Sequence, residues 1–147
     1  MTKAILAQFE AATKEFCALA KAVPIKSLHF APAPGEWPPA FVIHHLADCD
    51  AHFLVRFLNI LSEENPRIVP FNEESFPDAL QYEGRSIAVS LSTIEALSTQ
   101  LVNILSQLPD ESWNRTGLHD ERGKISLSDV LQTTTNHRMG HLDQIRQ

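Results

Sequence analysis

The chain has little of what marks secreted, membrane-spanning or nucleic-acid-binding proteins. It has two cysteines, Cys17 and Cys49, which are too few for a disulfide framework and favour reduced thiols in the cytoplasm. No run approaches the roughly 18 apolar residues of a membrane span, and polar residues interrupt the first segment too often for a signal peptide. Lysine and arginine number 12 against 18 for aspartate and glutamate, and an anionic chain gains little from neutralising phosphates. We therefore expect a cytoplasmic protein without membrane or nucleic-acid partners.

What the chain does have is the length and composition of one globular domain. Its 147 residues are 44% hydrophobic and 20% charged, which is ordinary for a folded globular protein. Because two domains would each lie near the lower size limit, residues 1–147 are expected to form a single domain.

Four segments place apolar residues at alternating steps of three and four, the spacing of a helix with one apolar face. They run from about 4 to 23, 39 to 61, 85 to 108 and 126 to 145. Prolines bound several of them, and the S-L-S-D run from Ser126 to Asp129 resembles a capping box. Residues 62–84 show no clean period, and a connection of that length is uncommon unless it crosses the fold or forms part of a site. The pattern predicts an all-α fold, a four-helix bundle with long crossing loops.

Seven histidines stand out, and a helical wheel separates those that face the core from those that do not. On the second helix, His45 lies at the margin of the apolar stripe, whereas His44 lies on the opposite face and is predicted to be solvated. On the last helix, His141 lies inside the stripe and His137 at its edge. These two residues are four apart, so their rings project from one face.

The inward-facing histidines have two interpretations. An i,i+4 histidine pair arises by chance roughly 0.3 times in a chain of this composition, and hydrogen-bonded core histidines are the plain alternative. Three neutral imidazoles facing a bundle interior would instead hold a divalent cation and leave one position open, as catalytic zinc requires.

Three further residues of the second helix also have paired interpretations. Asp48 would accept a hydrogen bond from an imidazole or remain a solvated carboxylate. Cys49 lies one turn from His45 and is a conceivable ligand, but its position in the middle of the stripe favours a small core side chain. Arg56 would hold an anionic substrate group or pair with an acidic loop residue. Asp48 and Arg56 are therefore candidate orienting or substrate-binding residues of a catalytic site.

Several runs carry a family likeness that spans about residues 36–146. The first are W-P-P-A-F-V-I-H-H-L-A-D (Trp37 to Asp48), V-R-F (Val55 to Phe57), E-E-N-P (Glu63 to Pro66) and P-F-N-E (Pro70 to Glu73). The later ones are H-D-E-R-G-K-I-S-L-S-D (His119 to Asp129) and H-R-M-G-H-L-D-Q-I (His137 to Ile145). In this order they resemble the DinB-like superfamily, and more narrowly its YfiT-type subgroup. Members of that subgroup are described as metal-dependent hydrolases and as bacillithiol S-transferases.

The resemblance implies a four-helix bundle that holds one divalent ion per chain, nickel or zinc, on three histidines. When the family's ligand positions are matched to this sequence, they correspond to His45, His137 and His141. The family pattern by itself leaves open whether His44 replaces His45, and the wheel favours His45. Relatives often have a histidine where Gly140 stands, at a position outside the ligand set. Dimerisation through helix faces fits the superfamily, so a homodimer stays an open possibility.

These observations lead to three hypotheses about function. The first is a metal-dependent thiol S-transferase, which joins a low-molecular-weight thiol to an electrophilic small molecule. The second is a metal-dependent hydrolase that activates water with the same ligands. The third is a non-catalytic, stress-associated metal-binding module. The sequence scarcely separates the first two, because their ligands are identical and no obvious general-base glutamate accompanies the histidine pair.

Overall fold

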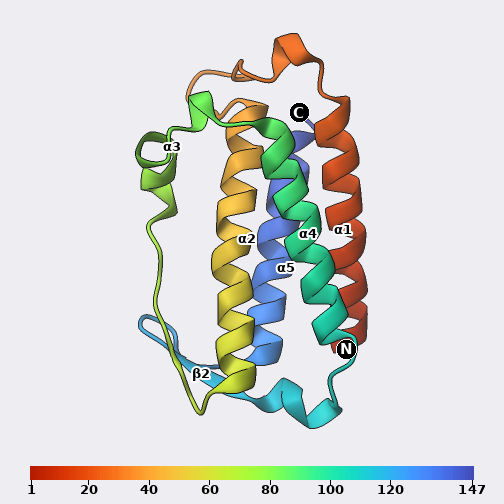
Figure 1. Ribbon diagram of the computed structural model, residues 1–147, viewed down its shortest axis with the longest axis vertical. Coiled ribbons are helices and arrows are strands. Elements are labelled where there is room, and N and C mark those ends of the chain that lie inside the picture. The colour runs from red at the N-terminus through yellow and green to blue at the C-terminus, as the bar shows by residue number, and fades with distance from the viewer.

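The computed structural model describes residues 1–147 and confirms four long helices packed as a bundle. They are α1 (Thr2–Ala22), α2 (Pro39–Ser62), α4 (Ile87–Leu105) and α5 (Leu127–Ile145). Both α1 and α2 pack against α4 and against α5 (Figure 1). The third helix ends at Leu105 rather than near Leu108, and the other boundaries lie close to those expected. By length and composition alone α4 could cross a membrane, a test that a core helix of a bundle also passes.

The helix ends follow the signals in the sequence. α1 ends before Pro24, and Pro39 opens α2 in the first turn, where a missing N–H costs no intrahelical hydrogen bond. At the start of α5, the Ser126 side chain accepts from the backbone N–H of Asp129, whose carboxylate accepts from the N–H of Ser126. The predicted capping box is therefore confirmed.

Two apolar clusters fill the bundle, and a layer of buried polar side chains lies between them along the helices. In this layer Arg138, which is 1% exposed, donates to Thr13 Oγ1 at 2.7 Å, to Ser98 Oγ at 3.4 Å and to Asp50 Oδ2 at 2.6 Å. Each of the four long helices contributes one of these residues. Because breaking a buried ion pair costs about 3–5 kcal/mol, the layer fixes α5 against its three neighbours one residue after His137.

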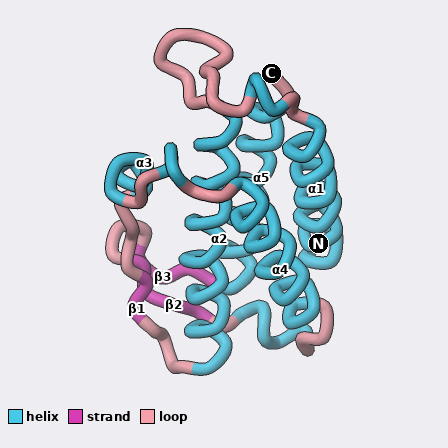
Figure 2. The backbone as a smooth tube through the Cα atoms, turned by 45° about the horizontal axis from the view of Figure 1, so that its top comes forward, coloured by secondary structure: helices cyan, strands magenta, loops and turns pink.

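A small sheet lies beside α2, and the sequence did not predict it. Its strands are β1 (Arg67–Ile68), β2 (Thr116–His119) and β3 (Gly123–Ser126), with β1 parallel and β3 antiparallel to the central β2 (Figure 2). A Cβ on Gly117 would lie 2.6 Å from Cδ1 of Ile68, so glycine allows β1 to approach β2. Strands of two to four residues are too short to show the alternation that identifies a strand in a sequence.

The segment between β1 and α4 crosses the outside of α2, as the missing periodicity indicated (Figure 1). It contains α3 (Phe76–Ala79) and short 3₁₀ turns at Glu73–Ser75 and Tyr82–Gly84. Phe71 stacks on the His52 ring of α2, with centroids 4.1 Å apart and planes 13° from parallel. This stack holds the segment against α2 and brings Glu73 toward the interior of the bundle.

Candidate metal centre

Three histidine rings converge between α2 and α5. The Nε2 atom of His137 lies 3.2 Å from Nε2 of His45 and 3.1 Å from Nε2 of His141. The three ring centroids are 4.5 to 5.3 Å apart. His45 is 2% exposed, and the other two are half-buried. The fold thus brings together the three histidines that the wheel and the resemblance selected.

The spacing of these nitrogens fits ligands around one cation. Zinc–nitrogen bonds of about 2.0–2.1 Å at tetrahedral angles place two ligand nitrogens about 3.3 Å apart. Both measured separations, 3.2 and 3.1 Å, lie close to that value. The side chains present therefore fit a divalent ion bound by His45, His137 and His141.

Each ring is held by a neighbour outside this set of three. The Nδ1 of His141 lies 2.8 Å from Oε1 of Gln144, so a hydrogen on Nδ1 leaves the lone pair on Nε2, which faces His137. The Trp37 ring meets His45 edge-on at 5.0 Å, and the Phe53 ring meets His137 edge-on at 5.2 Å. The orientation of the triad is therefore built into the packing of the bundle.

The environment keeps the three imidazoles neutral, which is the form that binds metals. Burial, together with the charges of the neighbouring histidines, lowers the pKa of His45 to about 4 and that of His137 to about 3. Burial also lowers the pKa of His141, although Gln144 and the charge of Glu73 oppose this shift. Near neutral pH all three rings therefore carry an available lone pair.

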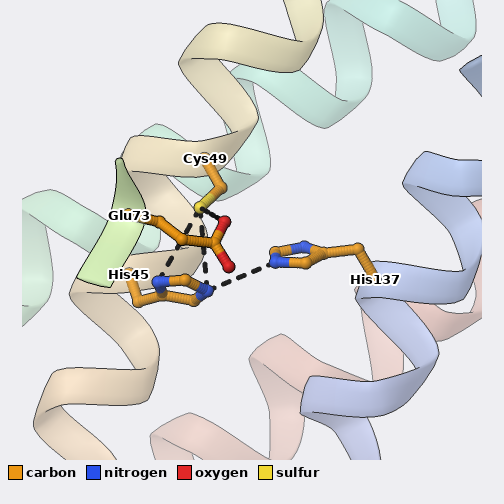
Figure 3. Close-up of side chains that lie close together, drawn as sticks. All are labelled: His45, Cys49, Glu73 and His137. Carbon is orange, nitrogen blue, oxygen red and sulfur yellow. Dashed lines mark hydrogen bonds between the residues drawn. The ribbon is translucent and has the colours of Figure 1, made fainter. Parts of the chain in front are cut away.

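Cys49 lies beside the triad but outside the direction of its lone pairs. Its Sγ is 3.6 Å from Nε2 and 3.7 Å from Nδ1 of His45, and an atom nearly equidistant from both nitrogens is in line with neither lone pair (Figure 3). Burial, together with the carboxylate of Glu73, raises the pKa of the thiol and keeps it protonated. The donor atoms of His45, Cys49, Glu73 and His137 do lie within 4.8 Å of one another. The two Nε2 separations of 3.1 and 3.2 Å match the spacing of ligands around zinc, so the three imidazoles form the better-placed set.

Glu73 is the residue of this centre that the sequence did not reveal. Its Oε2 accepts a long hydrogen bond from Cys49 Sγ at 3.5 Å, and its carboxylate lies over the space between His45 and His137 (Figure 3). The side chain is half-buried and comes from the crossing segment, not from a long helix. The only signal was its place in the P-F-N-E run, whose position in space the sequence does not give. The sequence showed no general-base glutamate next to the histidine pair, and Glu73 supplies such a carboxylate from another segment.

The prediction that His44 is solvated is wrong. Its side chain is fully buried, and its Nδ1 lies 2.7 Å from the Ser90 hydroxyl of α4. The Tyr82 ring lies 5.4 Å away on the same side. α4 and the turn at Tyr82–Gly84 cover the face of α2 that a single apolar stripe would leave to solvent. It is thus His45, not His44, that meets His137 and His141.

The two candidate catalytic residues of α2, Asp48 and Arg56, have different surroundings. Asp48 accepts two hydrogen bonds from Arg85, at 2.6 and 3.0 Å, and none from a histidine ring. Arg56 has no carboxylate within 4.0 Å, and its guanidinium lies 5.5 and 5.1 Å from the ring centroids of Phe53 and Phe71. Asp48 is therefore neutralised by its neighbour, whereas the charge of Arg56 is not.

Comparison with known proteins agrees with the fold and shows the family of the chain. The model of the DinB superfamily matches residues 8–145, and the chain therefore belongs to that superfamily. A protein of Oceanobacillus iheyensis named as a putative metal-dependent hydrolase is 35% identical over 111 residues, which are 76% of this chain and 64% of that protein. One of the same name from Bacillus cereus is 30% identical over 115 residues, 76% of this chain and 66% of its own length. The chain thus spans just under two thirds of the length of these curated relatives.

Two solved structures share the fold over nearly the whole chain. YfiT from Bacillus subtilis, a four-helix bundle, superposes with a TM-score of 0.84 at 22% identity, over 98% of this chain and 85% of YfiT. A mycothiol-dependent maleylpyruvate isomerase superposes with a TM-score of 0.79 at 13% identity, over 99% of this chain and 60% of the isomerase. At these identities the likeness establishes the bundle fold.

Proposed function

We propose that the protein is a metal-dependent thiol S-transferase, which joins a low-molecular-weight thiol to an electrophilic small molecule. In this proposal His45, His137 and His141 hold one nickel or zinc ion per chain. The observation that carries it is the convergence of three neutral imidazoles, in which Nε2 of His137 lies 3.2 Å from Nε2 of His45 and 3.1 Å from Nε2 of His141. No fourth imidazole closes the set. Three histidines and an open position are typical of catalytic zinc rather than structural zinc.

The side chains around the triad support such a reaction. A divalent ion held there supplies a positive charge that lowers the pKa of a thiol or water beside it. Glu73 is placed to take the proton that the thiol loses. The sulfur then forms a bond to carbon of the electrophile, whose leaving group departs with its electron pair. Trp37 and Phe53 pack against His45 and His137 and give the triad apolar neighbours.

The choice of a thiol is supported by the shared fold of the mycothiol-dependent isomerase, whose name states its use of a thiol. A second candidate is metal-dependent hydrolysis. The carboxylate of Glu73 favours it, because a general base beside a metal centre also activates water. The names of the Oceanobacillus and Bacillus relatives point the same way.

The test begins with metal content and continues with substrates. Protein purified without a metal-affinity tag is expected to contain about one nickel or zinc ion per chain, and His137→Ala should lose most of it while keeping its helical circular dichroism. The metal-loaded protein is then assayed with a halogenated aromatic electrophile and a set of low-molecular-weight thiols. Thiol-dependent consumption of the electrophile supports the transferase. Turnover of esters or amides without any thiol favours the hydrolase, and a metal-free protein that is equally stable without the histidines contradicts both.

A further inference from the structure

Two arginines of this anionic protein have no carboxylate partner, and their charges lie close enough to act on one another. The chain has seven arginines, and five of them form ion pairs with carboxylates within 4.0 Å: Arg67, Arg85, Arg115, Arg138 and Arg146. Arg56 and Arg122 form none, although the chain carries 18 carboxylates. Arg56 is half-buried, and the nearby charge of Arg122 adds to burial in lowering its pKa. Like charges held together in this way are unfavourable unless an anion joins them.

The two arginines come from different elements around the candidate metal centre: Arg56 from α2, and Arg122 from the β2–β3 turn beside α5. On α2, His45, Cys49, Phe53 and Arg56 follow one another at steps of four, four and three, so they share one face. Beside α5, the Arg122 side chain from the β2–β3 turn donates to Thr133 Oγ1 at 3.0 Å. Thr133 precedes His137 by one helical turn. Arg56 and the Thr133 contact of Arg122 therefore lie on the same side of the triad along the bundle. This is the end where α2 ends, α5 begins and the small sheet lies (Figure 1).

Arg56 is also connected to the triad by packed rings. Its guanidinium lies over Phe53, and the Phe53 ring contacts His137 at 5.2 Å. It lies over Phe71 as well, two residues before Glu73. The charge of Glu73 acts on Arg56, but the Glu73 carboxylate faces Cys49 and makes no ion pair with the guanidinium. The guanidinium donates one long hydrogen bond, at 3.5 Å, to the Val69 carbonyl. A hollow of about 420 Å³ between α2 and Arg67–Val69 opens on Arg56, so its remaining N–H groups can reach a ligand.

We propose that Arg56 and Arg122 together bind a carboxylate or phosphate group of the substrate, and so fix its reacting atom at the histidine triad. Guanidinium groups bind such anions through two parallel hydrogen bonds, and a pair of them selects for charge and for geometry. The rise along α2 from His45 to Arg56 is about 16 Å, and the rise along α5 from Thr133 to His137 is about 6 Å. The anionic group therefore lies about 6–16 Å from the reacting atom. This inference deepens the proposed function and rests on it for the reaction, because it names the substrate class as an anionic thiol or an anionic electrophile.

The binding of simple anions tests the site without a known substrate. Metal-free protein and zinc-loaded protein are titrated calorimetrically with succinate and with inorganic phosphate. In both forms we expect Arg56→Gln and Arg122→Gln each to weaken binding of at least one of these anions by tenfold or more, about 1.4 kcal/mol. The double variant should lose little more than either single one, because the two residues serve one ligand. Arg146→Gln removes the same charge just after the end of α5, where Arg146 pairs with Glu15 and Asp143. This variant should bind the anions as the original protein does.

The outcomes separate this inference from the proposed function. Anion binding that persists in both arginine variants and disappears in His137→Ala would mean that the anion binds the metal, which overturns the arginine site and leaves the metal centre standing. Equal losses in Arg146→Gln would mean a general charge effect and would also overturn it. If neither anion binds the original protein at millimolar concentration, the inference is wrong. Arginine-dependent binding in a protein that takes up no metal would support the anion site while contradicting the proposed enzyme.

Discussion

Two adjacent histidines of α2, His44 and His45, are both buried but have different surroundings. His44 faces a hydroxyl, that of Ser90, and the Tyr82 ring. His45 faces two further imidazoles, and a carboxylate with no cationic partner lies above it. The charge of Asp48 acts on both rings, but this carboxylate is already paired with Arg85.

The difference shows that burial of a histidine does not by itself indicate a ligand. Burial lowers the pKa of both rings to about 4, so both are neutral near pH 7. Only His45 directs its nitrogen at a point that other nitrogens share. The convergence of lone pairs therefore carries the functional interpretation, and the contacts of His44 are those of a structural residue.

The largest difference between His44 and His45 is expected when each is replaced by phenylalanine. His45→Phe removes one of the three nitrogens and should weaken zinc binding by more than about 100-fold, because even the loss of outer partners costs about 10–100-fold. His44→Phe leaves the Ser90 hydroxyl unpaired and should lower the free energy of unfolding by about 1–3 kcal/mol with zinc binding unchanged. Chelator competition and urea unfolding measure the two effects. If both variants lose zinc affinity to a similar extent, His45 is not distinguished from His44 as a metal ligand.

The carboxylate above the triad gives the next largest effect. Glu73→Gln should lower the turnover rate by about 10²–10⁴-fold, the usual contribution of a general base, while zinc stays bound. The exposed neighbour Glu74 provides the control, since Glu74→Gln removes the same charge away from the rings. If Glu73→Gln releases the metal instead, the carboxylate is a ligand and its assignment as a proton acceptor fails.

A smaller effect is expected from the hydrogen-bond partner of each ring. Gln144→Ala frees the Nδ1 of His141 and should weaken zinc binding by about 10–100-fold. Ser90→Ala removes the partner of His44 and should leave zinc affinity within about twofold, at a cost of about 1–3 kcal/mol in stability. Chelator competition distinguishes the two variants. An unchanged affinity in Gln144→Ala would show that the packing of α5 alone orients His141.

The sequence predicted the four helices and the inward histidines because both depend on periodicity within one helix. It failed for His44, since the wheel assumes one buried stripe, whereas α4, α5 and the turn at Tyr82–Gly84 bury nearly all sides of α2 near residues 42–47. It also could not place Glu73 or Arg122, which come from segments without a period. Where such residues lie depends on how the crossing segment and the β2–β3 turn pack, and that is a tertiary property.

The pH dependence of stability gives the smallest expected effect. In the metal-free protein the pKa values of His45 and His137 are about 4 and 3, below the ordinary value of about 6.5 in the unfolded chain. Between the folded and unfolded pKa values, the unfolded chain binds protons that the folded chain does not. The free energy of unfolding is therefore highest above pH 6.5 and falls as the pH drops below that value. The melting temperature should therefore decrease from pH 7.5 to 5, and less steeply in His137→Phe.

Replacement of the exposed His29 by glutamine should leave this pH slope unchanged. A melting temperature of the metal-free protein that is flat between pH 7.5 and 5 would contradict the neutral, buried state of the triad.

X-ray absorption of the zinc-loaded protein tests the central claim most directly, because it reports the atoms bound to the ion. The account predicts three imidazole nitrogens at about 2.0–2.1 Å, a light atom in the remaining position, and the same spectrum in Cys49→Ala. A sulfur neighbour at about 2.3 Å that disappears in Cys49→Ala, or fewer than three imidazoles, would contradict it.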